Sequence, residues 1–194
     1  MPDIKMESSR ISAGKPAFVG LVTAIICVLG PWALALPFSP VPITLGLFAV
    51  LLSTCLLKAH LGLLSCLIYL LLGFVGLPVF SGFTGGIGML LGPTGGYLLG
   101  YLCIPLCTLP FRFSRDNTIG HLIPGLSLGI ILCHSCGTLW LSFQSGISFR
   151  EAFLIGSLPY IPFDTAKLIL ACLFAKTIRK RLIKAGLYEK IIAS

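Results

Sequence analysis

The chain has 194 residues, of which 56% are hydrophobic and only 10% are charged, and its mean hydropathy is +1.01. This composition is too apolar and too poor in charge for an ordinary water-soluble domain, so it predicts an all-α, polytopic membrane protein. The net charge of +8 could suggest nucleic-acid binding, but the positions of the cations argue against it.

Apolar runs divide the chain into six expected transmembrane helices, because about 20 apolar residues cross a hydrocarbon core of about 30 Å. The predicted spans cover residues 17–36, 43–57, 61–75, 97–111, 122–143 and 153–175 of a single domain, 1–194, that ends in a basic tail, 176–194. The second and third spans are short and close together, which favours a tight helical hairpin. Residues 1–36 also resemble a secretory signal, but its removal would strand the basic tail beside uncharged loops, so we expect retention.

The cations mark one side of this arrangement. Arg150 lies on the opposite side and Lys167 lies inside span six; the other twelve share one side, and they are Lys5, Arg10, Lys15, Lys58, Arg112, Arg115, Lys176, Arg179, Lys180, Arg181, Lys184 and Lys190. The positive-inside rule therefore predicts a protein surrounded by lipid with both termini in the cytoplasm.

Two uncharged segments on the other side, 37–44 and 73–96, interrupt the apolar pattern. Pro37, Pro40 and Pro42 disfavour helix in the first, and the second is rich in glycine. Both remain apolar, and irregular backbone at membrane depth is tolerated only when it is buried in protein or lines a cavity. We expect them to cap a pocket open to the outside; the alternative is a pair of flexible linkers.

Asp164 and Lys167 are an opposite-charge pair within span six, spaced i and i+3 on one helix face. Each costs roughly 2.5–3.5 kcal/mol at the centre of a membrane helix, so such residues usually face a bundle interior. Pro159 and Pro162 are expected to break span six, which would place Asp164 near the start of a new helical segment. The pair could be a structural salt bridge, an ion relay or, as we favour, a ligand anchor.

Cys133-His134-Ser135-Cys136 is the pattern that most suggests enzyme chemistry. A membrane thiol oxidoreductase using Cys133 and Cys136 is therefore an alternative, although packing cysteines and a satisfied interior histidine are the more probable reading. The sequence has no P-loop and no evident catalytic triad or metal-ligand set. We therefore predict no enzyme activity, no cofactor and no metal.

Four motifs occur in order along nearly the whole chain. They are Ser39-Pro40-Val41-Pro42-Ile43-Thr44, Tyr69-Leu70-Leu71-Leu72-Gly73 continuing into Gly76-Leu77-Pro78-Val79-Phe80, Gly92-Pro93-Thr94-Gly95-Gly96-Tyr97, and Leu158-Pro159-Tyr160-Ile161-Pro162-Phe163-Asp164 with Lys167. With the six spans, this set resembles the BioY family, the substrate-binding S components of biotin transporters of the energy-coupling factor (ECF) type. The resemblance implies a six-helix S-component fold that captures biotin from outside and works with a transmembrane coupling subunit and two ABC ATPases. A stand-alone transporter is the other alternative.

The resemblance also implies site residues. The expected ligand contacts are Asp164, Lys167, Thr84, Tyr97, Phe80 and Phe83. Gly20 and Ala24 form a small-xxx-small pair expected to contact the coupling subunit. Relatives typically carry asparagine, arginine and often glutamine where this chain has Thr84, Leu98 and Gly46. Leu98 cannot supply a cation for a ligand carboxylate; Lys167 or backbone N–H groups and hydroxyls would take that role, or the ligand differs from biotin.

Overall fold

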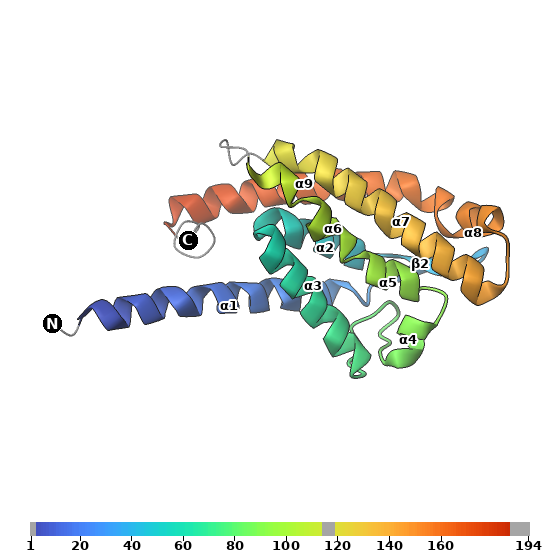
Figure 1. The fold of residues 1–194 in the computed structure, drawn as a ribbon, viewed down its shortest axis with the longest axis horizontal. Helices are drawn as coiled ribbons and strands as arrows, with labels where there is room; N and C mark the ends of the chain where they lie inside the picture. Colours follow the sequence, from blue (N-terminus) through green and yellow to red (C-terminus); the bar gives the residue numbers. More distant parts are fainter. Residues whose placement is uncertain (1–2, 114–118, 187–194) are drawn as a thin grey trace.

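The computed structural model describes residues 3–113 and 119–186, with side chains over 14–111 and 119–186. The chain is mostly helical (Figure 1). Its elements are α1 (Asp3–Leu29), β1 (Ala33–Leu36), β2 (Ser39–Thr44), α2 (Gly46–Leu56), α3 (Ala59–Phe74), α4 (Ile87–Leu91), α5 (Gly95–Gly100), α6 (Cys103–Cys107), α7 (Ile123–Ser145), α8 (Phe149–Gly156) and α9 (Ile161–Lys184), with short 3-10 turns at Pro110–Phe113, Ile119–Leu122 and Leu158–Tyr160. Arg115, Lys190 and the end of the predicted basic tail lie outside the described residues.

The helices form one bundle around a shared apolar core. α1 packs on α2 and α3, α2 packs on α9, α3 packs on α6, and α7 packs on α5, α6, α8 and α9. Ile26, Leu51, Tyr69, Ile104 and Leu126 are fully buried between these helices. α1 is long and its N-terminal part projects beyond the bundle (Figure 1).

The predicted first span is too long, and the all-α prediction needs a correction. α1 ends at Leu29, and residues 33–44 form an antiparallel hairpin that pairs Ala33 with Thr44. Pro31 explains the end of the helix, because proline lacks the backbone N–H and its ring clashes with the carbonyl four residues earlier. The proline-rich segment 37–44 is extended, as predicted, with β2 as its main part.

The predicted fourth span, 97–111, is also interrupted. α5 ends at Gly100 and α6 begins at Cys103. Pro105 accounts for this break, since its ring would clash with the carbonyl of Tyr101 in a continuous helix. The segment is therefore two short helices joined by a turn, both packed on α7.

The predicted break in span six is confirmed. α8 ends at Gly156, a 3-10 turn covers Leu158–Tyr160, and α9 starts at Ile161 with Asp164 in its first turn. At the other end of α8, Ser148 and Glu151 form a capping box.

Two helical segments in the described residues, Ile119–Ser145 and Phe149–Lys184, are long and apolar enough to cross a membrane. Four shorter apolar helices accompany them, namely Gly14–Leu29, Gly46–Leu56, Ala59–Phe74 and Gly95–Cys107. These six segments correspond in order to the predicted spans. Six membrane crossings nevertheless remain a prediction, because four of the helices are shorter than the usual span.

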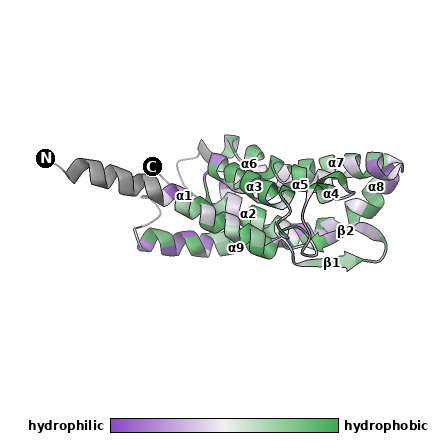
Figure 2. Ribbon diagram, turned by 90° about the horizontal axis from the view of Figure 1, so that it is seen from below, coloured by the Kyte–Doolittle hydropathy of each residue, from purple (hydrophilic) through white to green (hydrophobic). Residues whose placement is uncertain are grey.

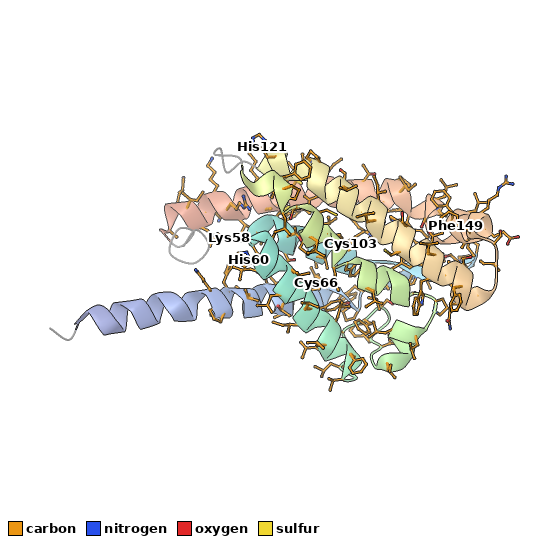
Figure 3. The ribbon with its side chains drawn as sticks, in the orientation of Figure 1. Lys58, His60, Cys66, Cys103, His121 and Phe149 are labelled. Carbon is orange, nitrogen blue, oxygen red and sulfur yellow. The ribbon has the colours of Figure 1, made fainter. Side chains whose placement is uncertain are left out.

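The two ends of the bundle differ in chemistry. Figure 2 shows apolar residues along most helices and hydrophilic residues at the C-terminal end of α9. Lys58 and His121 lie toward that end, whereas Phe149 lies at the opposite end (Figure 3). Strand β2 and helix α4, which belong to the two uncharged loops, are on the side of the bundle nearer Phe149 (Figures 1 and 3). The fold thus separates a basic end from a loop-covered end.

Candidate ligand-binding site

A cavity of about 60 Å³ lies between the helices and the two uncharged loops. The hairpin contributes Val41, Pro42 and Thr44 to its lining, and the second loop contributes Ser81 and Thr94. Its other walls come from α5, α7 and α9 and consist of Tyr97, Leu98, Tyr101, Ile130, Cys133, His134, Asp164 and Lys167, with Gly30, Leu47, Tyr69, Gly156 and Tyr160 completing the lining. The cavity is largely apolar, and both loops cover it as expected.

Asp164 is the polar centre of this cavity. Its Oδ1 accepts a hydrogen bond from Lys167 Nζ at 2.9 Å, and its Oδ2 lies 2.8 Å from His134 Nε2. The three side chains are 5%, 11% and 15% exposed, respectively. The predicted i, i+3 ion pair is therefore present and buried, with a histidine from α7 as a third member. Among the described residues lining the cavity, Asp164 and Lys167 are the charged ones, and they neutralise each other.

His134 connects this cluster to hydroxyl groups at the break between α8 and α9. Its Nδ1 lies 3.1 Å from Ser157 Oγ, which lies 2.7 Å from Thr138 Oγ1. Tyr97 donates its hydroxyl proton to the Gly156 carbonyl at 2.8 Å, and its oxygen is 3.4 Å from Ser157 Oγ. The polar network therefore joins α5, α7 and α9 behind an apolar cavity surface.

Hydrogen bonds and a ring contact hold the roof of the cavity in place. Tyr160 donates to the Val41 carbonyl, and the hydroxyls of Thr44 and Tyr101 lie 3.3 Å apart. The second loop is tied to the residues just before the hairpin, because Gly82 N–H donates to the Pro31 carbonyl at 2.9 Å. The rings of Trp32 and Phe83 also meet edge to face at 5.9 Å. The second loop is thus fixed to the start of the hairpin that carries the first loop.

Among the other four predicted ligand contacts, Tyr97 alone lines the cavity. Tyr97 lines the cavity and is 8% exposed, whereas Phe80 is buried against the edge of Tyr69 at a centroid distance of 5.5 Å. Phe83 is 61% exposed, and Thr84 donates to the Ser81 carbonyl. Phe80, Phe83 and Thr84 are not among the cavity-lining residues. Their contact with a ligand stays a prediction that would require the second loop to move.

Sequence reasoning missed the role of His134 beside Asp164. The histidine is a satisfied interior residue, as predicted, since both ring nitrogens have partners. Its partner Asp164, however, lies 30 residues away on another helix. A histidine in an apolar span was the available signal, because an ionisable group there usually pairs with another. The sequence alone does not indicate which helix supplies that partner.

The two cysteines of the CxxC pattern lie in different surroundings. Cys133 is buried, with its thiol 3.5 Å from the Tyr97 carbonyl, whereas Cys136 is exposed. All eight cysteines are free thiols. Within the described residues, no group of three His, Cys, Asp or Glu side chains could hold a metal ion.

Gly20 and Ala24 lie on the face of α1 that points away from the bundle. Both are exposed, and a Cβ added at Gly20 would meet no atom within 4 Å. Val22 and Thr23 face inward, where Thr23 Oγ1 is 2.8 Å from Ser65 Oγ on α3. The small pair is therefore available for contact with another helix, although that contact stays a prediction.

Comparison with known proteins agrees with this architecture. The model of the BioY family matches residues 5–184. The chain is 38% identical to the biotin transporter BioY2 of Lactococcus lactis subsp. cremoris, over 88% of this chain and 92% of that protein. It is also 38% identical to the biotin transporter BioY of Thermotoga maritima, over 83% of this chain and 93% of that protein.

A solved structure is similar along most of its length. It is the crystal structure of the S-component for biotin from an ECF-type ABC transporter, which superposes with a TM-score of 0.76 at 34% identity. The match covers 87% of this chain and 92% of that one. The motifs, the loop-covered cavity and these matches lead to one assignment: the chain is a membrane protein that belongs to the BioY family.

Proposed function

We propose that this protein is the biotin-binding S component of an ECF-type uptake transporter and that it catalyses no reaction itself. The observation that carries the proposal is the buried cluster of Asp164, Lys167 and His134 inside an otherwise apolar, loop-covered cavity. A small number of polar groups in an apolar pocket is the usual design of a site that fixes the orientation of a small ligand.

The chemistry of the cluster suits the ureido ring of biotin. This ring offers an N–H donor that the Asp164 carboxylate can accept, next to a carbonyl to which the Lys167 ammonium can donate. Tyr97, Tyr101 and Val41 supply apolar surface for the thioether bicycle. Asp164 and Lys167 are thus proposed to hold the polar head of the ligand.

The acidic tail of biotin would lie at the other end of the cavity, beneath the loops. Leu98 lines the cavity without offering a charge, and Lys167 already pairs with Asp164. The hydroxyls of Thr44, Ser81 and Thr94 and nearby backbone N–H groups are the available donors. We propose that these neutral groups, rather than a cation, receive the carboxylate.

The proposal includes partners and an orientation. The structure named above is an S-component of an ECF-type ABC transporter, and we propose that this chain likewise works with a transmembrane coupling subunit and two ABC ATPases. The concentration of cations at one end of the bundle supports six spans in the bacterial inner membrane, with both termini in the cytoplasm and the loop-covered end outside.

A calorimetric titration of the purified protein with biotin tests the function. The wild type is expected to bind biotin, and Asp164→Asn is expected to weaken binding by more than about tenfold, because a hydrogen bond to a charged group contributes roughly 1.5–3 kcal/mol. Thr165→Ala is the matched control, since Thr165 is exposed and its hydroxyl bonds only to the Ile161 carbonyl. A wild type that does not bind biotin would contradict the proposal.

A further inference from the structure

The carboxylate of Asp164 is held from two sides before any ligand arrives. Lys167, three residues later on α9, donates to Oδ1, and His134 on α7 contacts Oδ2. A carboxylate offers about four lone-pair positions, two on each oxygen. The two protein contacts therefore leave acceptor positions on the carboxylate that can receive a ureido N–H group.

When the His134 ring is neutral, the hydrogen bonds around it can run in only one direction. An ionised carboxylate only accepts, so Nε2 of His134 carries a proton and donates it to Asp164. In a neutral ring Nδ1 then accepts, which requires Ser157 to donate to it. The Ser157 oxygen in turn accepts from Thr138 at 2.7 Å. Each proton in this chain points toward Asp164, so the ring has one orientation that satisfies every partner.

His134 and Asp164 also separate the ligand cavity from a second, lateral cavity of about 550 Å³. This lateral cavity lies between α7, α8 and α9, and Ile131, Phe153 and Leu168 are among its apolar lining residues. His134 and Asp164 line both cavities. Without the bond from His134, Oδ2 of Asp164 would have space to turn toward the lateral cavity and away from the ligand.

We propose that His134 is a positioning residue for the ligand: it fixes the plane of the Asp164 carboxylate so that a free lone pair faces a ureido N–H group. This role rests on the proposed biotin binding and adds a specificity determinant on α7. It acts through Asp164 and requires no direct contact between His134 and the ligand.

The test compares His134→Ala with His134→Gln in the full-length protein by titration with biotin. Alanine removes the donor to Asp164, and the dissociation constant is expected to rise roughly tenfold. Glutamine can place an amide N–H near the position of Nε2, so binding is expected to recover to within about threefold of the wild type. Ser135→Ala is the matched control, because Ser135 is the next residue on α7 and its hydroxyl bonds only to the Ile131 carbonyl.

A double-mutant cycle shows whether His134 acts through Asp164. In an Asp164→Asn background, His134→Ala is expected to cost less than about twofold, because the carboxylate that it orients is gone. Equal losses in both backgrounds would overturn the role, and so would a glutamine variant as weak as the alanine variant. If His134→Ala does not fold, Ser157→Ala removes the donor to Nδ1, and unchanged biotin binding in that variant would overturn the role instead.

The outcomes also separate this inference from the proposed function. A wild type that binds biotin while His134→Ala binds equally well overturns the positioning role alone. A wild type that binds no biotin overturns both.

Discussion

Lys167 has more hydrogen-bonding capacity than Asp164 uses. Its ammonium has three N–H donors, and one of them is directed at Asp164 Oδ1 at 2.9 Å. The side chain is 11% exposed and lines the cavity, so the remaining donors can reach a ligand. Lys167 is therefore placed both to hold Asp164 and to donate to the carbonyl of a ureido ring.

Lys167→Ala is expected to weaken biotin binding by more than about tenfold, since it removes a charge-assisted hydrogen bond and leaves a buried carboxylate poorly paired. The loss should be equal for biotin and for its methyl ester, because Lys167 is proposed to serve the ureido head and not the acidic tail. Titration of both ligands measures this. A loss confined to biotin would assign Lys167 to the carboxylate.

At the residue scale, the sequence predicted what local spacing determines. The i, i+3 separation was enough to predict the ion pair of Asp164 and Lys167. It could not predict the bond from His134, because that contact depends on how α7 packs on α9. Phe80 was expected at the cavity, yet its ring fills the space beside Gly73 and Tyr69. Apolar side chains in a loop do not reveal which of them face a cavity.

Among elements, the connection between the hairpin and the start of α9 controls the roof of the cavity. Tyr160, just before α9, donates its hydroxyl proton to the carbonyl of Val41 in β2. The donor and acceptor are 119 residues apart and both line the cavity. This bond therefore couples the cover of the cavity to the helix that carries Asp164.

Tyr160→Phe keeps the ring and removes this bond. A neutral hydrogen bond contributes about 0.5–1.5 kcal/mol, so biotin should dissociate roughly three- to tenfold faster while the fold stays intact. Stopped-flow displacement of a bound fluorescent biotin measures the rate. Thr177→Ala, at the other end of α9, is the control, since its hydroxyl bonds only within the helix. An unchanged rate would show that the hairpin is held by other contacts.

The exposed small face of α1 predicts a separation of binding from transport. Gly20→Leu and Ala24→Leu should leave the affinity for biotin within about twofold of the wild type, because both positions are exposed. Uptake in cells that supply coupling subunits should nevertheless fall severalfold, because the larger side chains block the close approach of another helix. Radiolabelled biotin uptake and titration are measured in parallel. Ala166→Leu, on an exposed face of α9, is the matched control.

Full uptake in both leucine variants would exclude this face of α1 as a contact surface. Loss of binding together with uptake would instead indicate that the variants misfold. Uptake by the wild type in a host without coupling subunits would favour a stand-alone transporter instead.

Element boundaries followed the prolines more closely than the hydropathy did. The cluster of Pro159 and Pro162 predicted the break before α9. Pro31 follows the end of α1, and Pro105 accounts for the gap between α5 and α6. Neither boundary is visible in the apolar pattern, which continues across both. Hydropathy indicates whether a segment is buried in membrane or protein. It carries no information on the backbone hydrogen bonds that a proline interrupts, so it does not locate helix ends.

For the whole molecule, orientation follows from charge at the two ends of the bundle. Lys58 lies toward the basic end, and Arg150 follows Phe149, the first residue of α8, at the other end (Figure 3). A membrane-impermeant maleimide should label Arg150→Cys in intact cells and should label Lys58→Cys only after permeabilisation. The unsubstituted chain, which retains its eight free thiols, provides the background signal. The reverse labelling pattern would invert the proposed topology.

The overall architecture was predictable as an ordered set of apolar segments, because a high hydropathy and the positions of the cations constrain a membrane protein strongly. The cavity was predictable only as a location, beneath two uncharged loops and beside Asp164. Its lining depends on tertiary packing, such as the approach of Tyr97 to Gly156 across 59 residues of sequence.

The short helices α2 and α3 have a consequence for the surrounding lipid. They contain 11 and 16 residues, which at 1.5 Å per residue extend roughly 16 and 24 Å, less than a hydrocarbon core of about 30 Å. Lys58 lies at their junction, and the bilayer beside this hairpin is expected to thin toward it. Membranes with longer acyl chains would oppose that thinning, and the lipid annulus next to α2 and α3 is therefore part of what determines how well this protein fits its membrane.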